Sequence, residues 1–88
     1  MTVLEFVRYR PLGHLGVQEL KRLWNELIYI HSDPVSMGHF REACSSGLRQ
    51  LGTSPGEIFR FCTDEAYALE AADEALLAVG EELDQRHS

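Results

Sequence analysis

The serine, threonine and cysteine residues of this chain lack the neighbours that nucleophilic catalysis requires. Such a side chain becomes a nucleophile when an adjacent base activates it. The segment Ser45-Ser46-Gly47 lacks the first glycine of a Gly-x-Ser-x-Gly turn and lies inside a predicted helix. Residues 12–16 hold two glycines, but neither the spacing nor the Lys-Ser/Thr pair of a phosphate-binding loop. We therefore expect no catalytic residues and interpret residues 12–16 as a flexible hinge.

A metal site would need histidine and cysteine residues that share one face of an element. No Cys-x-x-Cys, His-x-x-x-His or Glu-x-x-His pair occurs in the sequence. Two cysteines are too few for a disulfide scaffold, and their apolar neighbours at helical spacing predict buried free thiols. We expect neither a metal nor a cofactor. The side chains that a metal site would have to use are His14, His31, His39, His87, Cys44 and Cys62.

The strongest chemical signal is the charge of the C-terminal segment. Residues 64–88 hold eight acidic side chains against one basic side chain, whereas residues 1–63 hold six against seven. A surface of one sign attracts partners of the opposite sign. General acid or base catalysis would need one of these carboxylates to be buried, and we expect them to be solvated. The residues predicted to bind a protein partner are Glu70, Asp73, Glu74, Leu77, Glu81 and Asp84.

These residues predict a small acidic protein-binding module, such as an adaptor, an inhibitor or an immunity-type protein. It would dock through its C-terminal helix on a partner with a basic surface and would have no enzymatic activity. Leu77 and Tyr67 are candidate apolar anchors, because buried anchors supply binding energy while charges mainly set the association rate and specificity. A plain solvated helix face is the competing interpretation.

Nucleic-acid binding is the first alternative function. In a ribbon-helix-helix arrangement, residues 2–9 would pair as strands across a dimer, and helices over 17–30 and 34–51 would follow. In a helix-turn-helix arrangement, residues 55–62 would form a reading helix that offers little besides one arginine. The acidic C-terminal segment would repel DNA unless it pointed away. The candidate contacts are Arg8, Arg10, Lys21, Arg22 and Arg60.

A structural homo-oligomer is the second alternative. A chain of 88 residues is near the lower end of the sizes that fold alone, so a second copy could supply part of its stability. A strand over residues 1–10 would have unpaired edges, and Arg8 and Arg10 could meet the acids of a neighbouring copy. Trp24 and Phe40 lie on apolar stripes and are predicted to belong to the core.

The elements that position these residues are predicted from the apolar pattern. We expect a mainly α fold: a single domain over residues 1–88, built as a small bundle of three to four helices with a short N-terminal strand-like arm. The composition, 44% hydrophobic and 25% charged, is that of a globular protein. No apolar run approaches the roughly 18 residues that cross a bilayer, and residues 1–5 do not resemble a signal peptide, so we expect a cytoplasmic protein without membrane contact.

The boundaries of the elements follow from capping and breaking residues. Residues 1–12 form the arm, because residues 2–9 are β-branched and aromatic, and helices are expected at about 17–31, 34–51, 55–62 and 64–85. The third helix opens with a capping box, Ser54 to Glu57, and should bury Ile58, Phe59 and Cys62. Whether it continues into the fourth is left open. The seam of the fourth helix is Leu69, Ala72, Leu76, Val79 and Leu83.

Overall fold

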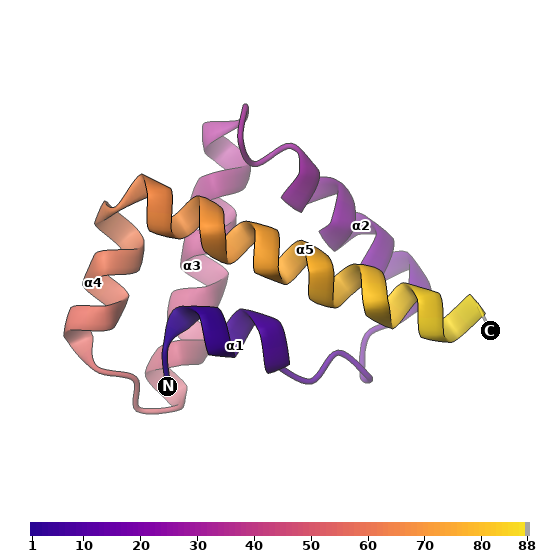
Figure 1. Cartoon of the computed structure of the whole chain (residues 1–88), viewed down its shortest axis with the longest axis horizontal. Helices are drawn as coiled ribbons and strands as arrows, with labels where there is room; N and C mark the ends of the chain where they lie inside the picture. Colours follow the sequence, from indigo (N-terminus) through magenta and orange to yellow (C-terminus); the bar gives the residue numbers. More distant parts are fainter. Residues whose placement is uncertain (88) are drawn as a thin grey trace.

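The computed structural model describes residues 1–87, and these residues form five helices (Figure 1). No strand occurs among them. The mainly helical architecture is therefore confirmed, with one helix more than expected. The helices are α1 (Val3–Tyr9), α2 (Val17–Ile28), α3 (Pro34–Gln50), α4 (Pro55–Thr63) and α5 (Glu65–His87).

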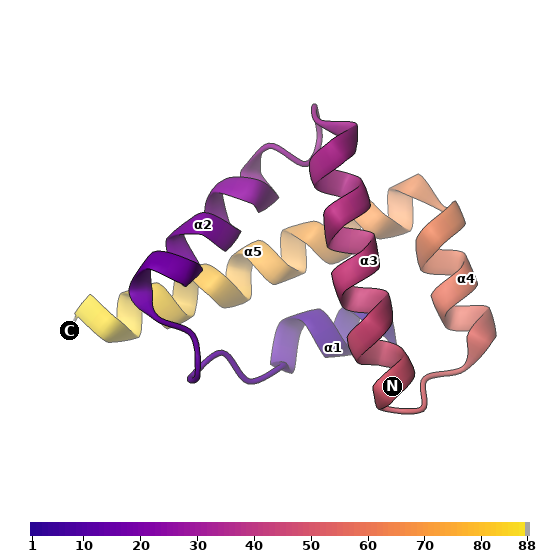
Figure 2. The same ribbon diagram turned by 180° about the vertical axis from the view of Figure 1, so that it is seen from behind.

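Helix α5 organises the molecule because it contacts each of the other four helices. It lies between α1 and α2, while α3 crosses its N-terminal half and α4 lies beside its N-terminal end, as the views from the front and from behind both show (Figures 1 and 2). The Cα atoms span 40 × 29 × 16 Å, so the molecule is flat. None of the five helices is long and apolar enough to cross a bilayer.

Small side chains on α5 explain how four helices can pack against one. Five alanines of this helix are buried, and their short side chains let the neighbouring backbones approach closely. Most of the larger core residues come from the other helices, with Leu20 and Leu27 of α2 and Leu48 of α3 almost inaccessible to solvent. Of the predicted seam, Ala72 and Val79 are buried, while Leu69, Leu76 and Leu83 lie at its margins, partly buried.

The prediction of a strand over residues 2–9 is wrong, because this segment is helix α1. Thr2 and Glu5 form a capping box: the Thr2 hydroxyl accepts from the Glu5 amide, and the Glu5 carboxylate accepts from the Thr2 amide. Val3 and Val7, one turn apart, are completely buried. The strand pairing that a ribbon-helix-helix dimer requires is therefore absent from residues 1–87.

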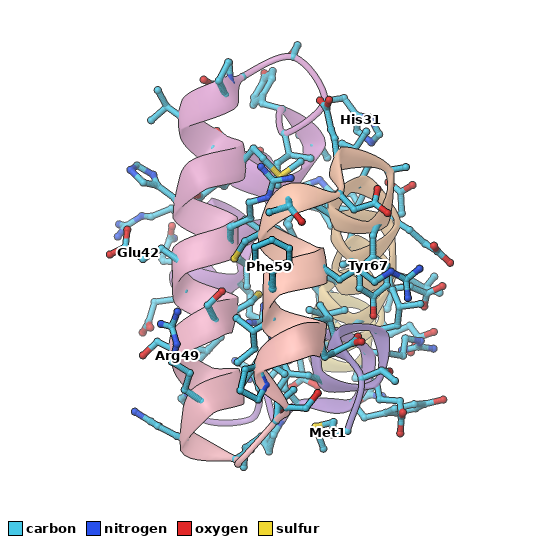
Figure 3. All side chains as sticks on the ribbon, turned by 90° about the vertical axis from the view of Figure 1, so that its left-hand side faces the viewer. Met1, His31, Glu42, Arg49, Phe59 and Tyr67 are labelled. Carbon is cyan, nitrogen blue, oxygen red and sulfur yellow. The ribbon has the colours of Figure 1, made fainter. Side chains whose placement is uncertain are left out.

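Helices α4 and α5 are separate. At Asp64 the backbone leaves the helical conformation, with φ −96° and ψ 105°. The Asp64 carboxylate accepts a hydrogen bond from the Tyr67 amide and so acts as the N-cap of α5. Ile58 is buried as expected, but Phe59 and Cys62 are exposed, because α4 turns Phe61 rather than Phe59 into the core. Phe61 packs edge-on against Phe40, with ring centroids 5.6 Å apart. Figure 3 shows Phe59 on the outer side of α4.

The ends of α2 and α3 differ slightly from the expected boundaries. Helix α2 ends at Ile28, three residues early, with Tyr29 as its C-cap. Helix α3 ends before Gly52, whose φ of 75° is the left-handed conformation typical of a glycine after a helix. Leu51, directly after α3, is 59% exposed. Cys44 is buried as expected, and this burial raises the pKa of its thiol to about 11.

Candidate docking surface

All six residues predicted to bind protein lie on the outward side of α5. Five are exposed, and the side chain of Glu74 is 41% exposed. Their spacing of three or four residues places them on one face, opposite the buried alanines. We call the five carboxylates of this face, Glu70, Asp73, Glu74, Glu81 and Asp84, the acidic stripe. Leu77 lies in the middle of the stripe and is 51% exposed.

One edge of the acidic stripe is held by α1. The Arg8 guanidinium donates to both Glu81 carboxylate oxygens, at 2.9 and 3.1 Å, and its Nε lies 3.7 Å from a Glu74 oxygen. These hydrogen bonds to Glu81 raise the pKa of Arg8. Arg8 therefore neutralises part of the charge of Glu74 and Glu81 within the chain. Arg8 was expected to meet the acids of a neighbouring copy, but it pairs with acids of its own chain.

The other edge of the acidic stripe lies beside α2, which runs antiparallel to α5. His31 Nε2, just beyond α2, is 3.3 Å from Asp73 Oδ1. Two turns further along, the indole of Trp24 lies against Gly80, where an added Cβ would be 3.0 Å from its Cζ3 atom. Lys21 lies level with Asp84 at the end of this register. Along this edge, His31, Trp24 and Lys21 therefore follow one another beside the acidic stripe.

Two adjoining shallow hollows, each about 330 Å³, open between α2 and α5. Both are lined by Trp24, Gly80 and Asp84; one extends to Lys21, and the other extends to Leu77 and Asp73. We call these two hollows together the Trp24 groove. Its lining is partly apolar, whereas its ends carry Asp73 and Asp84. The groove thus combines an apolar centre with negative charge.

The prediction that Trp24 belongs only to the core missed this groove. Trp24 packs against the core but is only partly buried, whereas Phe40 is buried as expected. The signal for the groove was Gly80, because a glycine inside a helix often marks a close approach by another group. Tyr67, expected as a second anchor beside the acidic stripe, is only 4% exposed and forms part of the core.

Tyr67 belongs instead to a polar cluster that joins α1, α4 and α5. The Glu57 carboxylate accepts from the Tyr67 hydroxyl and from the Val3 amide, the latter at 3.1 Å. These hydrogen bonds, that from Tyr67 above all, lower the pKa of Glu57. Arg60 lies over the Tyr67 ring, 4.0 Å from its centroid. Figure 3 shows Tyr67 on α5 beside α4 and Met1 at the start of the chain.

The five candidate nucleic-acid contacts do not form one basic face. Arg8 is paired with the acidic stripe, and Arg60 lies over Tyr67. Arg10 lies near the Phe6 ring, 5.9 Å from its centroid, and its Nε is buried. Lys21 and Arg22 are exposed on α2, and Lys21 lines a hollow together with Asp84 of α5. Arg8, Arg10 and Arg60 are therefore engaged with side chains of the chain itself.

A third hollow, of about 460 Å³, lies between the α2–α3 loop and the start of α5. It is lined by side chains of both charge signs, including His31, Arg41 and Glu65, and Arg41 Nε donates to the Phe61 carbonyl. Within residues 1–87, no three His, Cys, Asp or Glu side chains gather closely enough to hold a metal ion. The Trp24 groove and the acidic stripe therefore form the best-defined candidate site.

Comparison of the chain with protein-family models, curated proteins and solved structures finds no match.

Proposed function

We propose that this chain is a protein-binding module that docks a partner with a basic surface through the acidic stripe and the Trp24 groove. The observation that carries the proposal is the exposure of Leu77, a large apolar side chain 51% accessible in the middle of five carboxylates. A solvated helix face needs no leucine at its centre. An apolar anchor within a charged rim is the usual anatomy of a protein interface.

The two parts of the surface would contribute differently. Covering the exposed half of Leu77 contributes on the order of 1 kcal/mol from apolar area alone, and the partly exposed Trp24 adds to it. The carboxylates increase the association rate and disfavour acidic partners. A second copy is disfavoured as the occupant, because contact through the same face would bring two acidic stripes together.

Capture from untreated and nuclease-treated lysate, followed by affinity measurements on the purified pair, tests this proposal. Asp73→Asn/Asp84→Asn and Leu77→Ala are the informative variants, because neither disturbs the Arg8 contact that fastens α1. Glu42→Gln and Leu51→Ala are matched controls: Glu42 is exposed on α3, away from α5 (Figure 3), and Leu51 is exposed just after α3.

The expected result is one captured protein whose affinity falls about tenfold with each informative variant and stays unchanged with each control. Circular dichroism verifies that all four variants remain folded. Equal binding by wild type and the informative variants would overturn the proposal. Recovery of nucleic acid, with proteins that disappear after nuclease treatment, would favour the nucleic-acid alternative instead.

A further inference from the structure

The shape of the Trp24 groove narrows the kind of partner that can fill it. Its two walls are antiparallel helices held in one register, because His31 meets Asp73, Trp24 covers Gly80, and Lys21 is level with Asp84. The same register places Ile28, which is 42% exposed, level with Leu76. The two helices lie side by side in both views (Figures 1 and 2).

Charge and apolar surface alternate along this groove at helical spacing. Asp73 precedes Leu77 by four residues, and Asp84 follows Leu77 by seven. At a rise of 1.5 Å per residue, these intervals are about 6 and 10 Å along the axis. The apolar centre, formed by Leu77 and Trp24, thus lies between two carboxylates about 16 Å apart along α5.

We propose that the Trp24 groove binds an amphipathic helix of the partner protein. One large apolar side chain of that helix packs against Leu77 and Trp24. Lys or Arg residues of that helix lie about one turn from the apolar side chain in one direction and about two turns in the other. These basic residues pair with Asp73 and Asp84. This inference rests on the proposed function, and it adds the form of the partner and the spacing of its contacts.

Helix packing favours this occupant over an extended segment. No strand with an open edge occurs in residues 1–87, so a peptide has no backbone groups with which to pair as a strand. Two neighbouring helices offer ridges and grooves into which a third helix packs, as in helical bundles. Gly80 also favours a helical occupant, because its lack of a side chain lets the indole of Trp24 pack closely against α5.

Synthetic helical peptides of about 20 residues, long enough to populate a helix, test the inference directly. The matched peptide carries one Leu with Arg four residues before it and seven residues after it. A second matched peptide reverses this order, because a helix can bind in either direction. The control peptide has the same composition and helix propensity, but its Leu lies on the face opposite the arginines.

Binding to the full chain can be followed by calorimetry and by the emission of Trp24, the only tryptophan. We expect one matched peptide to bind about tenfold more tightly than the control and to shift the Trp24 emission. That preference should disappear in Leu77→Ala and in Asp73→Asn/Asp84→Asn, and it should persist in Leu51→Ala and Glu42→Gln.

The outcomes separate this inference from the proposed function. If matched and control peptides bind equally, and both lose affinity in Asp73→Asn/Asp84→Asn, the acidic stripe binds basic partners and the helix inference is wrong. If no peptide binds while a captured protein still depends on Leu77, the helix inference is also wrong. If neither peptides nor any captured protein respond to these variants, the proposed function fails as well.

Discussion

A methyl group added at Gly80 would lie 3.0 Å from Cζ3 of Trp24, so this glycine makes room for the indole between α2 and α5. That distance is too short for an undisturbed contact. Because hollows adjoin Trp24, its ring has space to shift when the contact tightens. Gly80 thereby sets the depth at which Trp24 lies in the groove.

Gly80→Ala should therefore change Trp24 more than it changes stability. Alanine stabilises a helix interior by about 1 kcal/mol relative to glycine, and this gain offsets the tightened contact. We expect the free energy of unfolding in urea to remain within about 1 kcal/mol of wild type, while the Trp24 emission shifts because its ring moves. A loss larger than about 2 kcal/mol would mean that the indole cannot move.

A pair of glycines in α3 tests the packing of α1, the segment whose β-branched residues predict a strand. An added Cβ at Gly38 would meet nothing within 4 Å, whereas one at Gly47 would lie 2.7 Å from the Phe6 ring of α1. Gly38→Ala should raise the free energy of unfolding by about 0.5–1 kcal/mol. Gly47→Ala should be at least about 1 kcal/mol less stable than Gly38→Ala, because the Phe6 ring must move. Equal stability of the two variants would contradict the position of α1.

Tyr67 should lose its hydroxyl proton at a higher pH than an unperturbed tyrosine does. Burial, together with its hydrogen bond to the Glu57 carboxylate, raises the pKa of Tyr67 to about 12. The unfolded chain loses this proton near pH 10, so Tyr67 stabilises the fold below pH 10, and that contribution disappears as the pH rises toward 12. The difference between the phenolate absorbance titrations of wild type and Tyr67→Phe isolates this group. A midpoint near 10 in that difference would show that Tyr67 does not donate to Glu57.

Glu57, in the same polar cluster, should make the stability of the fold depend on pH in the acidic range. Its pKa is lowered by the Tyr67 hydroxyl and the Val3 amide, so it stabilises the fold above the pKa of an unfolded glutamate and loses this effect as the pH falls. Glu57→Gln should therefore unfold at a lower urea concentration than wild type at pH 7, and the difference should shrink in acid. A difference that is constant between pH 7 and pH 3 would show that the charge of Glu57 contributes nothing.

Periodicity was sufficient to find α2, α3 and α5, although in α5 the alanines are buried more deeply than the predicted leucines. Periodicity failed for α1, because the β-branched residues of this segment favoured a strand. Thr2 and Glu5, which form a capping box, have the spacing that indicates the start of a helix. A helix of seven residues buries only two valines, too few for a periodic signal. Phe59 was misplaced because α4 has room for only two inward positions, which Ile58 and Phe61 occupy.

For the candidate site, the acidic residues were identified from charge alone, but their neighbours were not. The pairing of Arg8 with Glu81 joins residues 73 positions apart, and no local pattern predicts such a contact. The same holds for Trp24 and Gly80, which meet because α2 and α5 are antiparallel. Long-range contacts of this kind depend on how the helices pack, which a single sequence leaves undetermined.

The last prediction concerns Arg8, which occupies the acidic stripe in the way that a partner's arginine would. Arg8→Gln frees Glu74 and Glu81, so a basic partner or the matched peptide should bind several-fold more tightly, with a steeper salt dependence. Arg49→Gln is the matched control, because Arg49 is exposed on α3 and its removal changes the net charge equally (Figure 3).

Isothermal calorimetry at two salt concentrations distinguishes the explanations. A gain in affinity for Arg8→Gln alone identifies Arg8 as an internal competitor for the stripe. Equal gains for both variants would attribute the effect to net charge rather than to competition. A loss of affinity for Arg8→Gln would instead mean that Arg8 holds Glu74 and Glu81 in the positions that the partner recognises.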